Sequence, residues 1–279
     1  MNSLEALKDM RQSVSAITGL GLICILVLIA LFGPWIAPAD PLIPSPLIRL
    51  QGPSIDHLFG TDSLGRDILS RVIYGTRISL MIGVISVGIS IIPGTILGLF
   101  AGYFGKRVDS VIMRCMDMLL AFPAILLAIF ITAILEPSLT NTMVAVGIVY
   151  IPHYARIVRA SVLSLKGQLF VQAIEHLGGS HRRIIFRHIL PNCLPPIIVY
   201  ATLGMGTAVL QAAALGFLGL GAQPPSPEWG AMLSEGRQYI QLAPHVAAFP
   251  GAAILLLVLG FNLFGDGLRD VLDPSLRSQ

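Results

Sequence analysis

The sequence predicts an all-α, polytopic membrane protein with about six transmembrane helices. Hydrophobic residues make up 54% of its 279 residues and charged residues only 12%, and the mean hydropathy is +0.80. Several apolar runs approach the length of about 20 residues that an α-helix needs to cross a bilayer. These observations exclude an ordinary soluble domain. The net charge of +3 is too small to indicate a protein that binds nucleic acid.

Six segments are expected to span the membrane, at residues 17–37, 78–102, 111–135, 139–157, 191–220 and 246–266. The first is followed by Ala-Pro-Ala at residues 37–39, which resembles the cleavage site of a signal peptide. Its apolar run is longer than the hydrophobic region of such a peptide, and Pro-rich sequence follows directly. We therefore expect an uncleaved anchor.

The distribution of Lys and Arg predicts that both chain ends lie in the cytoplasm. With the N-terminus inside, most of the 18 basic residues fall in cytoplasmic segments, as the positive-inside rule requires. Those left outside are Arg49, Arg66, Arg71, Arg77 and Arg237. The predicted organisation is an N-terminal tail, first span and external loop (1–75), a membrane domain (76–268) with a cytoplasmic loop near 160–190, and a C-terminal cytoplasmic tail (269–279).

The densest basic segment of the chain, residues 172–192, lies in that cytoplasmic loop and contains three arginines and three histidines. Apolar residues at helical spacing predict a short amphipathic helix that ends at Gly178 and Gly179. Ser180 is expected to cap a second helix that leads into the next span. A solvated basic loop that touches anionic lipid is one interpretation; a docking element for another protein is the other.

The first external loop contains the stretch Gly-Thr-Asp-Ser-Leu-Gly-Arg-Asp at residues 60–67. Gly60 and Gly65 permit tight turns, and the Asp62 carboxylate can accept hydrogen bonds from nearby backbone amides. Asp67 is expected to pair with Arg66 or Arg71. A capped turn that packs over the membrane domain is favoured over direct contact with a solute.

Charged residues are also expected at the inner ends of two spans. Arg114 and Asp117 lie three residues apart and are predicted to neutralise each other, because an unpaired charge at membrane depth is costly. A second charged cluster lies at 266–270, where Gly265 and Gly267 are expected to end the last helix. Glycines at four-residue intervals, Gly94, Gly98 and Gly102, predict close packing of the second span against another helix.

The sequence lacks the motifs of several catalytic classes. It has no GxxxxGK[ST] phosphate loop, no HExxH and no GxSxG, and no span carries a central ionisable residue. The three cysteines are far apart, and His57 and His245 show no metal-ligand spacing. We therefore predict no catalytic residue, no metal site and no cofactor in this chain. Transport energy would have to come from another polypeptide.

The basic segment resembles the "EAA" loop of ABC importer permeases. Gln172 stands where the motif begins with Glu, Ala173 matches, Gly178 has the expected spacing, and residues 188–192 (His-Ile-Leu-Pro-Asn) match its end. The resemblance implies a type I ABC importer permease fold and a loop that docks in a cleft of the ATPase subunit. The residues assigned to that coupling role are Gln172, Ala173, Glu175, Gly178, Arg182 and Arg183.

Further segments resemble the second, "C"-type, membrane subunit of dipeptide, oligopeptide and nickel importers. These are residues 57–80, 113–123, 215–221, 224–233 and 261–274. In that family the external-loop motif comprises Gly60, Asp62, Gly65, Arg66 and Asp67 of this chain. The resemblance implies a multi-pass protein of the bacterial inner membrane. Its expected partners are a second, homologous permease, two ATP-binding subunits that hold ATP and Mg²⁺, an external binding protein and membrane lipid.

Other functions are considered beside this one. Within the family, a nickel or metal-chelate importer is the alternative to a dipeptide or oligopeptide importer. A secondary carrier would need inverted repeats and an ion site near the membrane midplane, which we do not find. A membrane-embedded enzyme would need a nucleophile and a base, and no such pair is evident.

Overall fold

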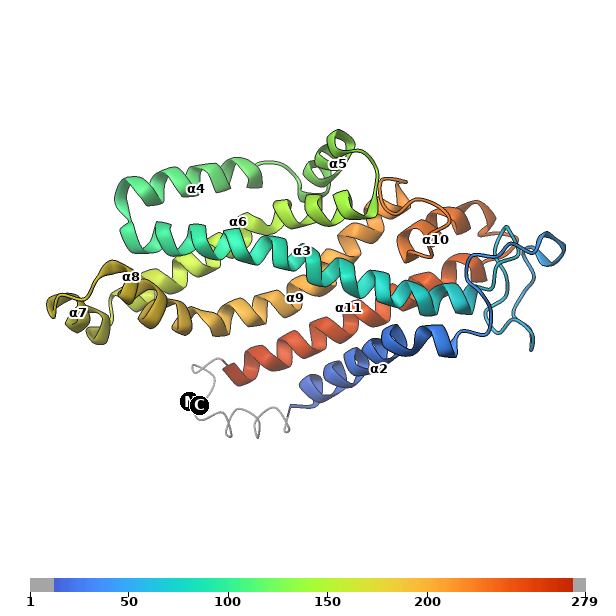
Figure 1. The fold of residues 1–279 in the computed structure, drawn as a ribbon, viewed down its shortest axis with the longest axis horizontal. Coiled ribbons are helices and arrows are strands. Elements are labelled where there is room, and N and C mark those ends of the chain that lie inside the picture. The colour runs from blue at the N-terminus through green and yellow to red at the C-terminus, as the bar shows by residue number, and fades with distance from the viewer. Residues whose placement is uncertain (1–12, 273–279) are drawn as a thin grey trace.

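The computed structural model describes residues 13–272, which form an elongated bundle of helices (Figure 1). In chain order the helices are α2 (Val14–Ile36), α3 (Ile68–Phe104), α4 (Lys106–Leu120), α5 (Ala124–Leu135), α6 (Leu139–Lys166), α7 (Leu169–His176), α8 (His181–Arg183), a π-helical segment η2 (Ile184–Ile189), α9 (Leu190–Phe217), α10 (Trp229–Gly236) and α11 (His245–Leu272). Two single 3₁₀ turns, η1 (Pro46–Ile48) and η3 (Arg237–Tyr239), lie in the connections. The predicted all-α class is confirmed.

Among the described residues, four helical segments are each long and apolar enough to cross a membrane, and six spans result if two bent helix pairs each count as one. One bent pair differs from the prediction of a single helix at 111–135. α4 and α5 meet at 88°, with Pro123 directly before α5. α4 carries five charged residues on one side, and the 12 residues of α5 span only about 18 Å. Neither helix alone matches the hydrocarbon thickness of about 30 Å.

The glycines at four-residue intervals in α3 bring this helix close to α6. A Cβ atom added at Gly94 would lie 2.6 Å from the Cβ of Tyr154, and one at Gly98 would lie 2.5 Å from the carbonyl oxygen of Ala155. At Gly102 the nearest atom would be the Val162 Cβ, at 2.7 Å. Real Cβ atoms do not approach so closely, so only glycine allows these helices to touch. The predicted close packing is confirmed.

Gly265 and Gly267 do not end α11, which continues to Leu272. Instead they let α11 pass close to its neighbours. A Cβ at Gly267 would lie 2.6 Å from the Cβ of Ala16 on α2, and one at Gly265 would lie 2.8 Å from the Cγ of Leu203 on α9. The sequence predicted that these glycines end the helix. In the structure they lie instead where α11 contacts α2 and α9.

The bundle has two distinct ends (Figure 1). The start of α2, the end of α11, and α7 with α8 lie toward one end, which we call the hairpin end. The segment 37–67 between α2 and α3 lies at the other end with α10, and we call this the loop end. Of the predicted cytoplasmic tails, residues 269–272 belong to the end of α11, whereas residues 1–12 and 273–279, with Lys8, Arg11 and Arg277, lie outside the described residues.

Candidate functional site

At the hairpin end, α7 stops at a glycine turn. Gly178 has a φ of +78°, and its N–H donates to the Glu175 carbonyl at 3.0 Å while the Gly179 N–H donates to the Ile174 carbonyl at 2.9 Å. These two bonds form a Schellman motif, in which the left-handed residue is normally glycine. The predicted elbow is therefore present, and a positive φ is needed at Gly178.

The second arm of this hairpin is continuous with the next span. Ser180 accepts a hydrogen bond from the Arg183 N–H, as predicted for a cap. α8 then passes through the π-helical segment into α9, so the chain from His181 to Phe217 forms one helical span. The inner face of the hairpin is anchored in an apolar cluster of Val158, Val162, Val171, Ile184, Ile185 and Ile189.

The outer face of the hairpin is exposed. Gln172, Ala173, Glu175, Gly178, Arg182 and Arg183 all belong to this face. Two leucines beside them are also exposed, Leu169 at 83% and Leu177 at 87%. Neither Arg182 nor Arg183 has an acidic partner within the part of the chain described. The structure thus brings the predicted coupling residues together on one protruding surface that combines apolar and basic side chains.

One polar contact joins the hairpin to the end of α3, and another joins the end of α6 to the end of α3. Lys166 Nζ donates to the Tyr103 carbonyl oxygen at 2.7 Å, and the Tyr103 hydroxyl lies 2.7 Å from His181 Nδ1. The hairpin is therefore attached to α3 through His181, and α3 is attached to α6 at the same end.

The expected pairing of Arg114 with Asp117 is wrong. Asp117 of α4 pairs with Arg156 of α6 at 2.5 Å, and Asp109 binds the Arg159 guanidinium through both carboxylate oxygens. The chain reverses at Gly105 between α3 and α4, and α4 lies beside α6, so charges from different helices become neighbours. Spacing along one helix could not reveal this pairing.

At the loop end, the external-loop motif forms a buried ion-pair network. Asp62 Oδ1 accepts from the backbone N–H groups of Leu64 and Arg66, both at 2.9 Å. Its other oxygen binds Arg66 Nε at 2.6 Å, and Arg66 also donates to Glu235 Oε2 at 2.7 Å. Arg71 Nε lies 3.5 Å from Asp62. We call Asp62, Arg66, Arg71 and Glu235 the ion-pair network.

The network joins three segments that are far apart in sequence. The Arg66 and Arg71 side chains are only 2% and 0% exposed, so their charges need buried partners. Arg71 also donates to the carbonyl oxygen of Pro41. Glu235 is a network residue that sequence reasoning missed, because it lies 169 positions after Arg66 and no local pattern links them.

Asp67 has a different role from the predicted pairing with Arg66 or Arg71. Its carboxylate caps α3 by accepting from the Ser70 N–H and hydroxyl, both at 2.8 Å, and its other oxygen lies 2.9 Å from His57 Nδ1. Gly60 and Gly65 have φ values of +75° and +77°, as tight turns require.

Glu228 is a second buried acid at this end that the sequence did not indicate. It caps α10 by accepting from the Gly230 and Ala231 N–H groups at 2.7 and 2.8 Å, and its residue is only 2% exposed. Burial raises the pKa of this carboxyl above its usual value, although the two backbone hydrogen bonds oppose the shift.

No group of three or more His, Cys, Asp or Glu residues is placed to hold a metal ion among residues 13–272. His57 and His245 both lie at the loop end, where one contacts Asp67 and the other approaches the Thr61 carbonyl oxygen at 3.4 Å. These contacts stabilise the fold of the external loop. The two segments in which the sequence predicted site residues are thus an exposed hairpin and a structured external loop.

Two family profiles match this chain. Residues 94–278 match the binding-protein-dependent transport system inner membrane component family, and residues 4–53 match the N-terminal transmembrane domain of oligopeptide transport permease C. The chain belongs to the binding-protein-dependent transport permease family. It is accordingly a multi-pass subunit of the bacterial inner membrane, and ATP is bound by partner ATPases rather than by this permease.

Curated relatives match the permease over almost its whole length. It is 54% identical to the dipeptide transport system permease protein DppC of Alkalihalophilus pseudofirmus, over 98% of this chain and 90% of the relative. It is 49% identical to the di/tripeptide permease DppC of Pseudomonas aeruginosa, over 98% and 93%. It is 48% identical to the glutathione permease GsiD of Pectobacterium atrosepticum, over 96% and 89%.

Solved structures confirm the predicted importer permease fold. A chain of the MetNI methionine ABC transporter in an inward-facing conformation superposes with a TM-score of 0.60 at 20% identity, over 73% of this permease and 97% of that chain. A chain of an amino acid ABC transporter gives a TM-score of 0.56 at 16% identity, over 76% and 95%. At such low identity, the likeness concerns the fold alone.

Proposed function

We propose that this permease is the C-type membrane subunit of an ATP-driven importer for short peptides. The observation that carries the proposal is the 54% identity to a dipeptide permease over 274 residues. Relatives named for di/tripeptides and for glutathione, itself a tripeptide, are nearly as similar. We therefore assign peptides of two or three residues as the solute class.

The exposed hairpin is proposed to couple the permease to an ATPase subunit. Its inner face is packed against α3 and α6, so its position is fixed, whereas Leu169 and Leu177 expose large apolar surfaces to solvent. Apolar surface in water is unfavourable by about 25 cal/mol per Å², and a protein partner would remove it. Arg182 and Arg183 lie beside these leucines and supply charge for acidic residues at the rim of such a contact.

Gln172 occupies the position at which the EAA motif begins with a glutamate. The side-chain amide of Gln172 donates to the Gly167 carbonyl oxygen at 3.3 Å, which supports the start of α7. A salt bridge from this position to the ATPase is therefore not part of the proposal. The apolar contact and the arginines carry the interaction instead.

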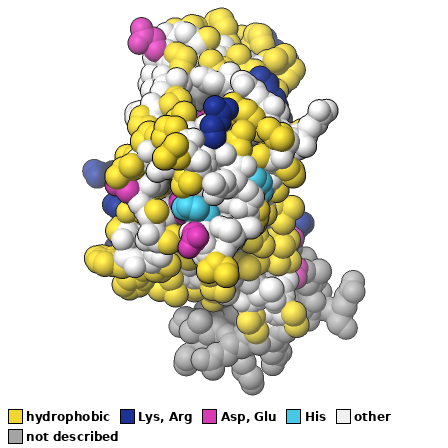
Figure 2. Space-filling view, turned by 90° about the vertical axis from the view of Figure 1, so that its right-hand side faces the viewer, with side chains coloured by type: hydrophobic (Ala, Val, Ile, Leu, Met, Phe, Trp, Pro, Cys, Tyr) yellow, Lys and Arg dark blue, Asp and Glu magenta, His cyan; other side chains and the backbone are white. Residues whose placement is uncertain are grey.

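The complete importer is proposed to contain this permease, a second and homologous permease, two ATP-binding subunits and an external binding protein. The binding protein would dock at the loop end. Figure 2 looks onto this end and shows apolar side chains over much of it, with a few charged side chains and histidines among them. The ion-pair network would hold this surface in one shape.

The test is peptide uptake by the reconstituted importer. The permease is combined with its proposed partners in proteoliposomes, and a radiolabelled dipeptide is supplied with the binding protein outside and ATP inside. We expect ATP-dependent accumulation that stops when either permease is omitted. Accumulation of nickel complexes in place of peptides would assign the alternative solute class, and uptake without ATPase subunits would refute the proposal.

A further inference from the structure

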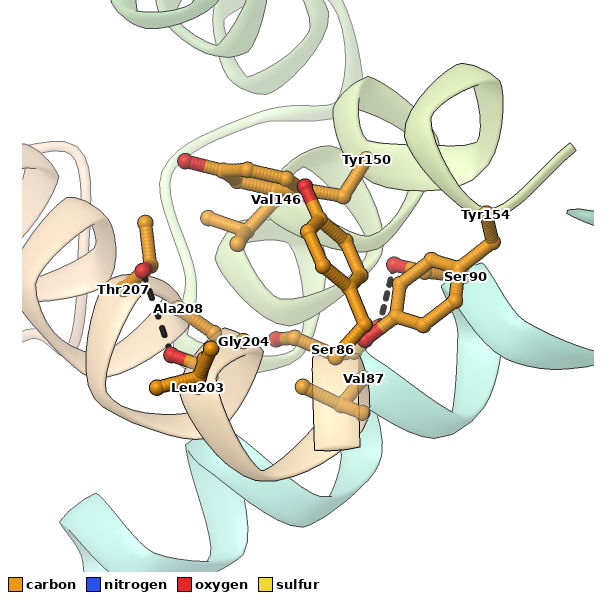
Figure 3. A pocket seen from close by; sticks show the side chains of 11 residues that line it. Ser86, Val87, Ser90, Val146, Tyr150, Tyr154, Leu203, Gly204, Thr207 and Ala208 are labelled. Carbon is orange, nitrogen blue, oxygen red and sulfur yellow. Dashed lines mark hydrogen bonds between the residues drawn. The ribbon is translucent and has the colours of Figure 1, made fainter. Parts of the chain in front are cut away.

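A cavity of about 100 Å³ lies between α3, α6 and α9 (Figure 3). Its polar lining consists entirely of hydroxyl groups, which belong to Ser86, Ser90, Tyr150, Tyr154, Tyr200 and Thr207. The remaining lining residues are apolar, and none is charged. Such a surface can donate and accept hydrogen bonds but offers nothing to balance an ionic group. We call it the hydroxyl cavity.

Two of these hydroxyls are buried without a hydrogen-bond partner. Tyr154 and Ser86 are each 1% exposed, and within residues 13–272 neither the Tyr154 hydroxyl nor the Ser86 Oγ has a partner at hydrogen-bond distance. In Figure 3 the Tyr154 side chain extends from α6 toward Ser86 of α3. A buried polar group without a partner costs about 1–3 kcal/mol, so these groups mark a place where a ligand would be stabilised.

The backbone around the cavity leaves room for the Tyr154 hydroxyl. A Cβ atom added at Gly204 of α9 would lie 2.8 Å from the hydroxyl oxygen. The Tyr154 ring also packs edge-on against Tyr200, with 5.1 Å between ring centroids and 81° between ring planes. The ring is thus held by its neighbours, and its buried hydroxyl lies beside the Gly204 backbone at the lining of the cavity.

Three lining residues form the accessible side of the cavity. Tyr150 and Tyr200 are half-buried and Thr207 is exposed, whereas Ser86, Ser90 and Tyr154 are buried. A group that enters would therefore pass between the tyrosines of α6 and α9 and end at the unpartnered hydroxyls.

We propose that the hydroxyl cavity is a solute-contact site that holds one backbone amide group of a peptide in transit. An amide presents one N–H donor and one carbonyl acceptor, and it is neutral, as the lining requires. Because every peptide has this group, the site would accept different side chains equally. The inference rests on the proposed peptide-import function and assigns a contact site within it.

The test compares a peptide with its ester analogue in the intact importer. Radiolabelled alanyl-alanine and the analogue in which an ester oxygen replaces the amide N–H are supplied to proteoliposomes with the same binding protein. The same binding protein is used with every permease variant, so its preference for one solute over the other changes every uptake ratio by the same factor. This factor cancels when the ratios of two variants are compared. Tyr154→Phe and Ser86→Ala each remove one unpartnered hydroxyl with little change in shape.

We expect the variant that loses the acceptor for the amide N–H to lower the peptide-to-ester uptake ratio about fivefold, which corresponds to one hydrogen bond of about 1 kcal/mol. The other variant, which loses the donor to the carbonyl oxygen, should lower the uptake of both solutes together. Tyr74→Phe, in α3 but outside the cavity, should keep the wild-type ratio. An unchanged ratio in both cavity variants would overturn the assignment of the cavity. If the wild-type importer accumulates neither solute, the proposed function fails instead.

Discussion

Gly178 offers the sharpest test of the docking hairpin. Its φ of +78° is unfavourable for any residue with a Cβ atom, and the penalty is about 1–2 kcal/mol. A Cβ built at this position meets no atom within 4 Å, so a larger side chain adds no clash inside the permease. Gly178→Arg should therefore destabilise the permease only through the strain of a positive φ. A membrane bundle of this size tolerates such a cost.

The effect on the complex should be much larger than the effect on the fold. A bulky cation would stand on the surface that is proposed to enter the ATPase cleft, between Leu177 and the arginines of α8. Disrupting a central interface residue typically costs 2 kcal/mol or more in binding, about 30-fold in affinity. Gly178→Arg should thus insert normally and pair with the second permease, yet lose most of the ATPase subunit during purification and most peptide uptake.

A matched control separates backbone strain from docking. Gly219 has a φ of +80°, and a Cβ there also meets no atom within 4 Å, but it follows α9 at the loop end. Gly219→Arg should therefore suffer the same strain while retaining the ATPase subunit. Both variants are measured for membrane yield, ATPase copurification and uptake. Full ATPase retention and wild-type uptake in Gly178→Arg would refute the docking role and leave a solvated basic loop.

Four further outcomes follow from the same structure. In a cysteine-free background, a cysteine at Gln223 should react with an impermeant thiol reagent from outside and one at Ser180 should not; the opposite labelling would reverse the predicted topology. The purified permease alone should hydrolyse no ATP, and turnover that persists without partners would contradict its assignment. Arg66→Ala should destabilise the fold by about 3–5 kcal/mol in thermal unfolding, because it removes the closest cation from the buried Asp62 carboxylate and from Glu235, whereas Arg49→Ala, at an exposed position, should change it little. The raised pKa of Glu228 means that its ionised form is disfavoured in the folded state, so the stability of the fold should decrease as pH rises above the usual carboxyl pKa of 4.5 toward the raised value. Glu228→Gln should remove this pH dependence. If the variant and the wild type showed the same dependence of stability on pH, this would argue against burial of the charge.

The membrane class, the spans and the hairpin were predictable because they depend on local sequence. Length and apolarity identify a helix that crosses a bilayer wherever it packs, and Gly178 with Ser180 encodes a turn and a cap through backbone geometry alone. The glycines of α3 likewise predicted a close contact with another helix, although they did not indicate which helix. The family resemblance rested on the same local motifs, and the profile matches confirmed it.

The tertiary structure decided which distant groups meet. Arg66 pairs with Glu235 and Asp117 with Arg156, because folding brings together segments that no sequence spacing relates. For the same reason Gly267 contacts α2 rather than ending α11, and Tyr154 reaches a cavity shared by three helices. A helix and its caps are stabilised by interactions within a few residues, whereas ion pairs and cavities form between surfaces whose relative positions only the packed bundle defines.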